Sequence, residues 1–263
     1  MRQWKKEWNL LLHHGRNTDS VKTFSKELGI NNYLISGNGA ILYDIKNDEI
    51  IHSGFLSKEK VLEIATICEE NSIHYNIYTE KEIITKNLAY NVLYYYKENL
   101  NKPEEKRTKI NIVTDIISYI NKTENENFLK IMICDEDIKI FNSIMKKIKS
   151  LNNLDLIDTQ YMSRKKIKCG DEEVVVEYFY TEITNENVNK WTAIEYLINK
   201  LNIKKEEVIA IGDNFNDREM IENAGLGIVM GNSNPFMKIC GDIIVTDNDS
   251  EGVSEAIKQY ILT

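Results

Sequence analysis

The sequence predicts an α/β protein with a parallel-sheet core that an inserted α+β domain interrupts. Three observations support this fold class. Helical and strand-like segments alternate near both ends of the 263-residue chain, as in crossover units between parallel strands. Residues 55–178 differ from both ends of the chain, because their predicted helices alternate with longer strands. The length also exceeds that of a typical single domain. We therefore expect a core formed by 1–54 and 179–263, with 55–178 inserted between its two parts.

The first core segment contains one predicted helix and one predicted strand. Residues 18–28 have helical spacing, and Gly29 closes that helix. The sequence YLIS at 33–36 follows as a short strand, and the turn GNGA comes directly after it.

The inserted segment is predicted from two clear helices and three strand-like runs. Between them, residues 121–127 (NKTENEN) read as a polar loop. Three consecutive tyrosines, 94–96, are placed in a strand, where packing is favoured over a stacking platform for bases or sugars. The helices are expected at 58–70 and 137–149, and the strands at KINIVT, FLKIMIC and EEVVVEYFY.

The last core segment gives the most regular pattern. A helix at 191–201 precedes the β-branched run VIAI at 208–211, which ends at Gly212. After the loop GDNFND, the remaining elements are a helix around 218–223 and short strands at 227–230 and 243–245. Ligands of such parallel sheets bind at the carboxyl ends of the strands.

The composition narrows the function classes. With 33 basic and 41 acidic residues the net charge is −8, which disfavours a general nucleic-acid binder because phosphate neutralisation needs a basic face. The four cysteines are far apart and suggest neither a zinc cage nor a disulfide framework. No apolar run has the length of a membrane span, and MRQWKKEW lacks a signal-peptide core, so we expect a cytoplasmic protein without a membrane partner.

Two carboxylates four residues apart directly follow a predicted buried strand. Asp213 is expected at the strand tip and Asp217 near the first turn of the next helix. Charge beside an apolar strand is costly unless it meets a partner, and Mg²⁺ with oxygen ligands is a natural one. The alternative is structural, with Asp213 as a helix cap and Asp217 as a solvated first-turn acid.

Lys190 begins the helix that precedes this strand. Alone, a lysine there is most simply a surface charge. Together with Asp213, a cation aimed at the same strand ends would stabilise both a carboxylate and a phosphoryl group in transfer.

These motifs resemble the C-terminal half of the Cof-type haloacid dehalogenase (HAD) superfamily of phosphatases. The resemblance covers nearly the whole chain from Gly15 onward, and it rests on Lys190, GDNFND, Met220, AGLGIVMGN and DIIVTDNDSEGV, with GRNTDSVKTFSKELGI and GNGA nearer the start. It implies a Rossmann-like parallel-sheet core with a large type-two cap. It also implies Mg²⁺-dependent hydrolysis of small phosphorylated metabolites such as sugar phosphates, through an aspartyl-phosphate intermediate.

The resemblance also assigns residue roles. Asp213 would ligate Mg²⁺ and Asp217 would support the metal site. Lys190 would bind the nucleophile and the phosphate, and Asn216 would contact the phosphoryl group. Arg16 would lie beside the phosphate entrance.

The sequence departs from the family at its start. It contains no DxDGT, the motif that ends the first core strand and supplies the nucleophile, and His14 stands where Thr or Ser is expected before Gly15. Adjacent His13 and His14 would point to opposite faces of a strand, so they do not chelate one ion easily. A single dropped base before Gly15 explains the departure, so we expect residues 1–14 to be out of frame and the true gene to start further upstream. The first core strand is then expected to be missing from this chain.

Three functional classes follow from this reading. The intact gene product would be a phosphatase, and the chain as written is expected to be inactive. The alternatives are a catalytically dead remnant that still binds phosphate or metal, and an interaction module on the same fold.

Overall fold

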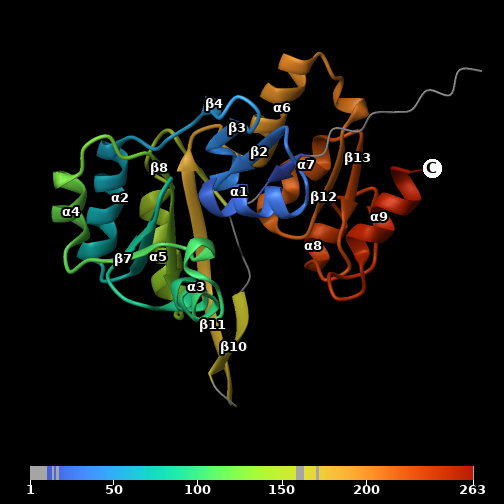
Figure 1. Cartoon of the computed structure of the whole chain (residues 1–263). Coiled ribbons are helices and arrows are strands. Elements are labelled where there is room, and N and C mark those ends of the chain that lie inside the picture. Colours follow the sequence, from blue (N-terminus) through green and yellow to red (C-terminus); the bar gives the residue numbers. More distant parts are fainter. Residues whose placement is uncertain (1–10, 14, 16–17, 158–162, 170–171, 263) are drawn as a thin grey trace, which may run out of the picture.

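The computed structural model describes residues 11–13, 15, 18–157, 163–169 and 172–262. These residues form two lobes that lie side by side (Figure 1). The core lobe contains both ends of the described chain, and the cap lobe is built from the segment between them. The α/β architecture predicted from the sequence, a core with parallel strands and an inserted α+β cap, is confirmed.

The first part of the core lobe is a four-stranded ladder in the order β1-β2-β3-β4. Strand β1 runs parallel to β2, with Leu12 opposite Leu34 and His13 opposite Ile35. The other two pairings are antiparallel. Its elements are β1 (Leu12–His13), α1 (Thr18–Glu27), β2 (Tyr33–Ser36), the 3₁₀ turn η1 (Gly37–Gly39), β3 (Ile41–Asp44) and β4 (Glu49–Ser53).

The second part of the core lobe is a parallel three-stranded ladder in the order β12-β13-β14. Helices alternate with these strands, as the sequence predicted. The elements are α6 (Lys190–Leu201), η3 (Lys205–Glu207), β12 (Ile209–Gly212), η4 (Phe215–Asp217), α7 (Arg218–Asn223), β13 (Leu226–Val229), α8 (Pro235–Lys238), β14 (Ile243–Ile244) and α9 (Gly252–Tyr260).

Helix α6 joins the two ladders of the core lobe through one apolar cluster. Its buried residues Trp191, Ile194 and Leu197 pack with Leu42 of the first ladder and Val229 of the second. The helix begins at a capping box, in which the Asn189 side chain accepts from the backbone N–H of Thr192. This places the first residue of α6, Lys190, beside the carboxyl end of β12.

The cap lobe is built on a sheet of seven strands in the described part of the chain. The order is β10-β11-β8-β5-β6-β7, and β9 pairs with β11. The strands are β5 (His74–Thr79), β6 (Ile83–Thr85), β7 (Ile110–Ile112), β8 (Phe128–Asp135), β9 (Leu154–Leu156), β10 (Ser163–Cys169) and β11 (Glu172–Asn185). The helices are α2 (Lys58–Glu70), α3 (Tyr90–Leu100), η2 (Glu104–Lys106), α4 (Ile116–Lys122) and α5 (Ile138–Ile148).

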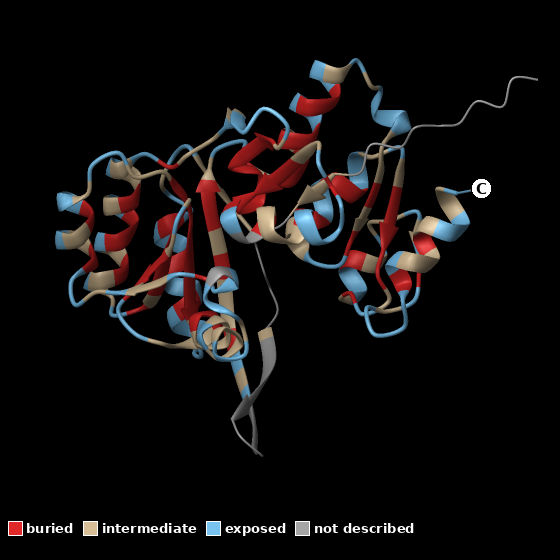
Figure 2. Ribbon diagram, in the orientation of Figure 1, coloured by how far each residue is buried: buried red, intermediate tan, exposed pale blue. Residues whose placement is uncertain are grey.

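The two faces of the cap sheet have different roles. Helices α2, α4 and α5 cover the outer face, where Ile64, Ile120 and Ile144 pack on Ile131 and Ile133 of β8. The buried faces of these helices are red in Figure 2, and their exposed faces are pale blue. The intervening strand residues, such as Met132, belong to a cluster that continues into the core lobe. The inner face of the cap sheet is thus directed at the core.

Two details of the cap differ from the sequence-based expectations. The tyrosine run 94–96 lies in helix α3 and not in a strand, because Val92 and Tyr95 occupy one helical face and pack inward while Tyr96 is exposed. Asn121 and Lys122 close helix α4, so the polar loop is shorter than predicted.

Strand β11 crosses the boundary that the sequence predicted for the end of the inserted domain, residue 178. Strand β11 runs without interruption through residue 178 to Asn185 and pairs with β8 and β9. We therefore propose that the insertion ends near 185.

None of the helices in the described ranges has the length and apolarity needed to cross a bilayer.

Candidate active site

The loop after β12 is organised around Asp217. Its carboxylate Oδ2 accepts the backbone N–H of Asp213 at 2.9 Å and that of Asn214 at 3.0 Å. Gly212 makes this approach possible, because a Cβ at that position would lie 2.5 Å from the Asp217 Cβ. Asp217 is therefore a buried acid that shapes the loop, and the alternative of a solvated first-turn acid is wrong.

Lys190 forms an ion pair with the other oxygen of Asp217. The Lys190 Nζ donates to Asp217 Oδ1, and the two side chains are only 6% and 4% exposed. Burial alone would raise the pKa of Asp217, but the Lys190 ammonium and the hydrogen bonds hold that pKa below its usual value. Lys190 is thus a buried, paired cation and not the surface charge that a lone lysine in this place would suggest.

Asp213 stands at the tip of β12 with a more open carboxylate. Its Oδ2 accepts one hydrogen bond, from Asn232 Nδ2 at 3.2 Å. Partial desolvation and then repulsion from Asp217 raise the pKa of Asp213. A cation bound beside Asp213 would offset this repulsion between the two carboxylates.

Asn216 connects the loop to the cap lobe. Its Nδ2 donates to Asn38 Oδ1 at 3.1 Å, and Asn38 in turn donates to Glu182 of β11. Asn38 is buried in the η1 turn with a left-handed φ of 60°. One polar chain therefore runs from the loop, through η1, to the cap sheet.

These side chains border a cavity of about 480 Å³, called the inter-lobe cavity below. Both lobes contribute to its wall. From the core lobe come His13, Gly15, Lys190, Ile211, Gly212, Asp213, Asn214, Asn216, Asp217, Met230, Asn232, Asn248 and Val253. From the cap lobe come Tyr78, Asn91, Tyr95, Lys130, Met132, Ser163, Tyr178, Tyr180 and Glu182.

Four of the five predicted site residues thus border one cavity. Lys190, Asp213, Asn216 and Asp217 are brought together there. Arg16, the fifth, lies outside the described residues, as does His14.

His13 enters the cavity wall from the end of β1. Its Nδ1 is buried and has no hydrogen-bond partner among the described residues. Burial and the neighbouring Lys190 ammonium lower its pKa to about 3, so the imidazole is neutral at physiological pH.

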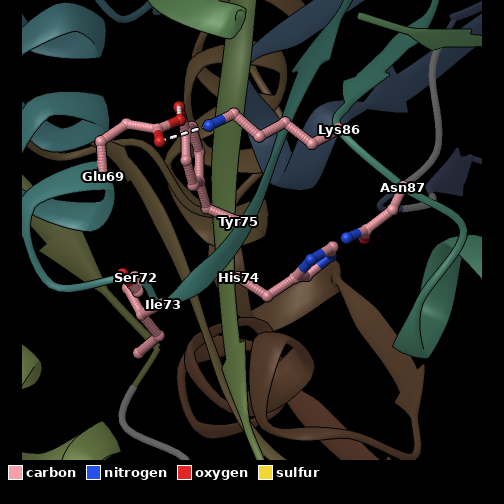
Figure 3. A pocket seen from close by; sticks show the side chains of 7 residues that line it. All are labelled: Glu69, Ser72, Ile73, His74, Tyr75, Lys86 and Asn87. Carbon is pink, nitrogen blue, oxygen red and sulfur yellow. Dashed lines mark hydrogen bonds and ion pairs between the residues drawn. The ribbon is translucent and has the colours of Figure 1, made fainter. Parts of the chain in front are cut away.

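A second cavity, of about 260 Å³, lies in the cap lobe between the end of α2, the start of β5 and the segment after β6 (Figure 3). Its charged side chains already satisfy one another, since Lys86 pairs with Glu69 and the Tyr75 hydroxyl donates to Glu69 at 2.7 Å. It contains no residue of the predicted site. We therefore place the chemistry in the inter-lobe cavity.

The inter-lobe cavity suits a hard divalent cation with few protein ligands. No cluster of three or more His, Cys, Asp or Glu that could hold a metal occurs in the part of the chain that is described. Mg²⁺ commonly keeps several waters and uses one or two carboxylates together with substrate phosphate oxygens. Asp213 could supply such a carboxylate, whereas both oxygens of Asp217 already accept hydrogen bonds.

Comparison with known proteins identifies the family. The profile of the haloacid dehalogenase-like hydrolases matches residues 2–257. The chain belongs to this family. The phosphatase YwpJ of Bacillus subtilis is a HAD relative 24% identical over 262 residues, which cover 94% of this chain and 86% of YwpJ. By family, the chain is a HAD-type phosphatase, as the motifs predicted.

Solved HAD structures share the fold. A HAD-like hydrolase from B. subtilis superposes with a TM-score of 0.76 at 22% identity, covering 95% of this chain and 87% of that one. A HAD subclass IIB sugar phosphatase gives a TM-score of 0.70 at 17% identity, covering 97% and 86%. The family match includes residues 2–14, and their proposed reading out of frame stays a prediction.

Sequence reasoning overlooked the polar residues that the cap lobe contributes. Lys130 interrupts the apolar run FLKIMIC, and Glu182 shares a strand face with Tyr178 and Tyr180. An isolated charge in an otherwise apolar strand was the available signal. The pairing of Lys130 with Glu182, 52 residues apart in sequence, was not readable without the sheet register.

Proposed function

We propose that the intact gene product is a Mg²⁺-dependent phosphatase of small phosphorylated metabolites such as sugar phosphates. The observation that carries the proposal is the convergence of Lys190, Asp213, Asn216 and Asp217 on one cavity between core and cap. When bound, Mg²⁺ would neutralise phosphate charge during transfer.

Each of the four site residues that border the cavity has a distinct proposed role. Asp213 holds the cation, and Asp217 fixes the loop and the Lys190 ammonium. Lys190 binds the transferring phosphoryl group, where a preorganised cation stabilises the developing charge. Asn216, oriented by Asn38, contacts the same phosphoryl group.

We further propose that the nucleophile belongs on a strand between β1 and β12. Each of these strands has one described ladder partner, β2 and β13, and the last residue of each lines the inter-lobe cavity. A strand in that place would end at the cavity and present DxDGT to Lys190. The sequence of this chain has no such motif, so we propose that the chain is inactive as written.

Hydrolysis of p-nitrophenyl phosphate with Mg²⁺ tests the proposal. The chain as written should give no turnover above buffer. A version with an upstream DxDGT strand should turn over, and a version carrying NxDGT instead is the matched control. A restored protein that folds but stays inactive would remove the main support for an enzyme.

A phosphate- or metal-binding remnant is the second candidate, and an interaction module is the third. The binding residues are present without the nucleophile motif, which is what a remnant would retain. Phosphate binding by the chain as written, with no turnover after restoration, would favour the remnant. The genomic DNA upstream of the Gly15 codon tests the frameshift, because stop codons in every frame there would exclude it.

A further inference from the structure

Lys130 and Glu182 form an ion pair in the cap wall of the inter-lobe cavity. They lie on neighbouring antiparallel strands, β8 and β11, with Lys130 Nζ 2.5 Å from Glu182 Oε1. The side chains are 4% and 13% exposed, and both border the cavity. The pair is therefore shielded from bulk water yet adjacent to any bound ligand.

The carboxylate of Glu182 is held ionised. Burial would raise its pKa, but Lys130, the Asn38 amide and more distant Lys190 together keep that pKa below its usual value. Asn38 donates to Oε2 while Lys130 takes Oε1. The Lys130 ammonium also lies 4.7 Å from the centre of the Tyr78 ring. Both charges are thus fixed in place by several contacts.

The other described side chains that the cap contributes to the cavity are uncharged. They are tyrosine, asparagine, methionine and serine residues. Within the described wall, the positive charge of Lys130 is consequently cancelled by Glu182. A ligand group that reaches the cap meets hydroxyl, amide and aromatic surfaces beside a neutralised pair.

We propose that Glu182 is a specificity-determining residue that neutralises Lys130 and so selects phosphate esters whose remaining part is uncharged. This inference rests on the phosphate site proposed above. A second anionic group on the ligand would approach the Glu182 carboxylate and find the nearby cation already paired. Rejection by a like charge is a common source of specificity.

Equilibrium binding with two matched sugars tests the inference. Titration calorimetry of the full chain with Mg²⁺ would compare glucose 1-phosphate with glucuronic acid 1-phosphate, which differ by a carboxylate in place of a hydroxymethyl group. The wild type should bind glucose 1-phosphate tighter by about tenfold or more. Glu182→Gln should strengthen binding of the acid about tenfold, because it frees Lys130 to pair with the ligand.

The controls separate this inference from the phosphate site itself. Glu186→Gln removes the same charge from an exposed loop outside the cavity and should leave both affinities within about twofold. Inorganic phosphate should bind the wild type and Glu182→Gln alike, because glutamine keeps a side-chain oxygen that can accept from Asn38. If phosphate binds but the two sugars bind the wild type equally, the inference is wrong and the phosphate site stands. If phosphate does not bind at all, both are wrong.

Loss of one partner from a buried pair can prevent folding. The double variant Lys130→Gln/Glu182→Gln avoids an unpaired charge and keeps the test decisive. It should lose most of the discrimination between the two sugars without gaining a preference for the acid. Retention of the wild-type ratio in this variant would also overturn the inference.

Discussion

The buried Lys190–Asp217 pair permits a quantitative prediction. Lys190→Met keeps the length of the side chain but removes the cation that pairs with the Asp217 carboxylate, which is only 4% exposed. Two unit charges 4 Å apart attract by about 4 kcal/mol at an effective dielectric constant near 20. Breaking one side of a buried pair typically costs about 3–5 kcal/mol. We expect the free energy of unfolding to fall by about that amount.

A double-mutant cycle isolates the pair from other effects. Asp217→Asn retains an oxygen that can accept the two backbone N–H groups of the loop. The double variant Lys190→Met/Asp217→Asn should therefore be more stable than the sum of single losses implies, with a coupling of about 2–3 kcal/mol. Urea denaturation followed by circular dichroism measures all four proteins. Additive losses, or a loss below about 1 kcal/mol for Lys190→Met, would refute the reasoning.

Three further predictions concern stability. In the unfolded chain His13 binds a proton below about pH 6.5, whereas in the folded protein its pKa is lowered to about 3 and the imidazole stays neutral. The free energy of unfolding should therefore fall by about 2 kcal/mol from pH 7 to pH 5. His13→Gln should flatten that slope in urea titrations, and an unchanged slope would count against it. Gly212→Ala should lower the free energy of unfolding by about 1–3 kcal/mol, because the added Cβ would overlap Asp217. Gly29→Ala is the control, since its added Cβ meets no neighbouring atom and only the backbone strain at φ 70° changes. Asp137→Ala removes the N-cap of α5 and should cost about 1 kcal/mol in thermal melts, with Asp137→Asn close to wild type.

Local patterns predicted the elements that have clear boundaries. The helix 58–70 is α2, because Ser57 caps its start and four apolar residues fall on one face. The segment 218–223 is helix α7, between the GDNFND loop and a short parallel strand. The spacing of apolar residues is enough to locate an element where the segment is short and its ends carry turn or cap residues.

Other features depend on contacts between distant segments. The tyrosines of α3 favour strands by intrinsic preference, yet packing of Tyr95 against the cap sheet decides for a helix. Asn38 and Glu182 meet although 144 residues separate them. The motif around Asp213 and Asp217 could be located from sequence, whereas their division into an open carboxylate and a buried, lysine-paired one required the structure.

Phosphate binding in the presence of Mg²⁺ tests the central claim most directly. Titration calorimetry of the full chain with inorganic phosphate should show binding that requires Mg²⁺, and Asp213→Asn should abolish the Mg²⁺ dependence while leaving the fold intact. The exposed Asp19→Asn, in helix α1 and outside the cavity wall, is the matched control and should bind as the wild type does. Phosphate binding that neither Mg²⁺ nor Asp213→Asn alters, or no binding by the folded chain, would contradict a shared site for ion and phosphate.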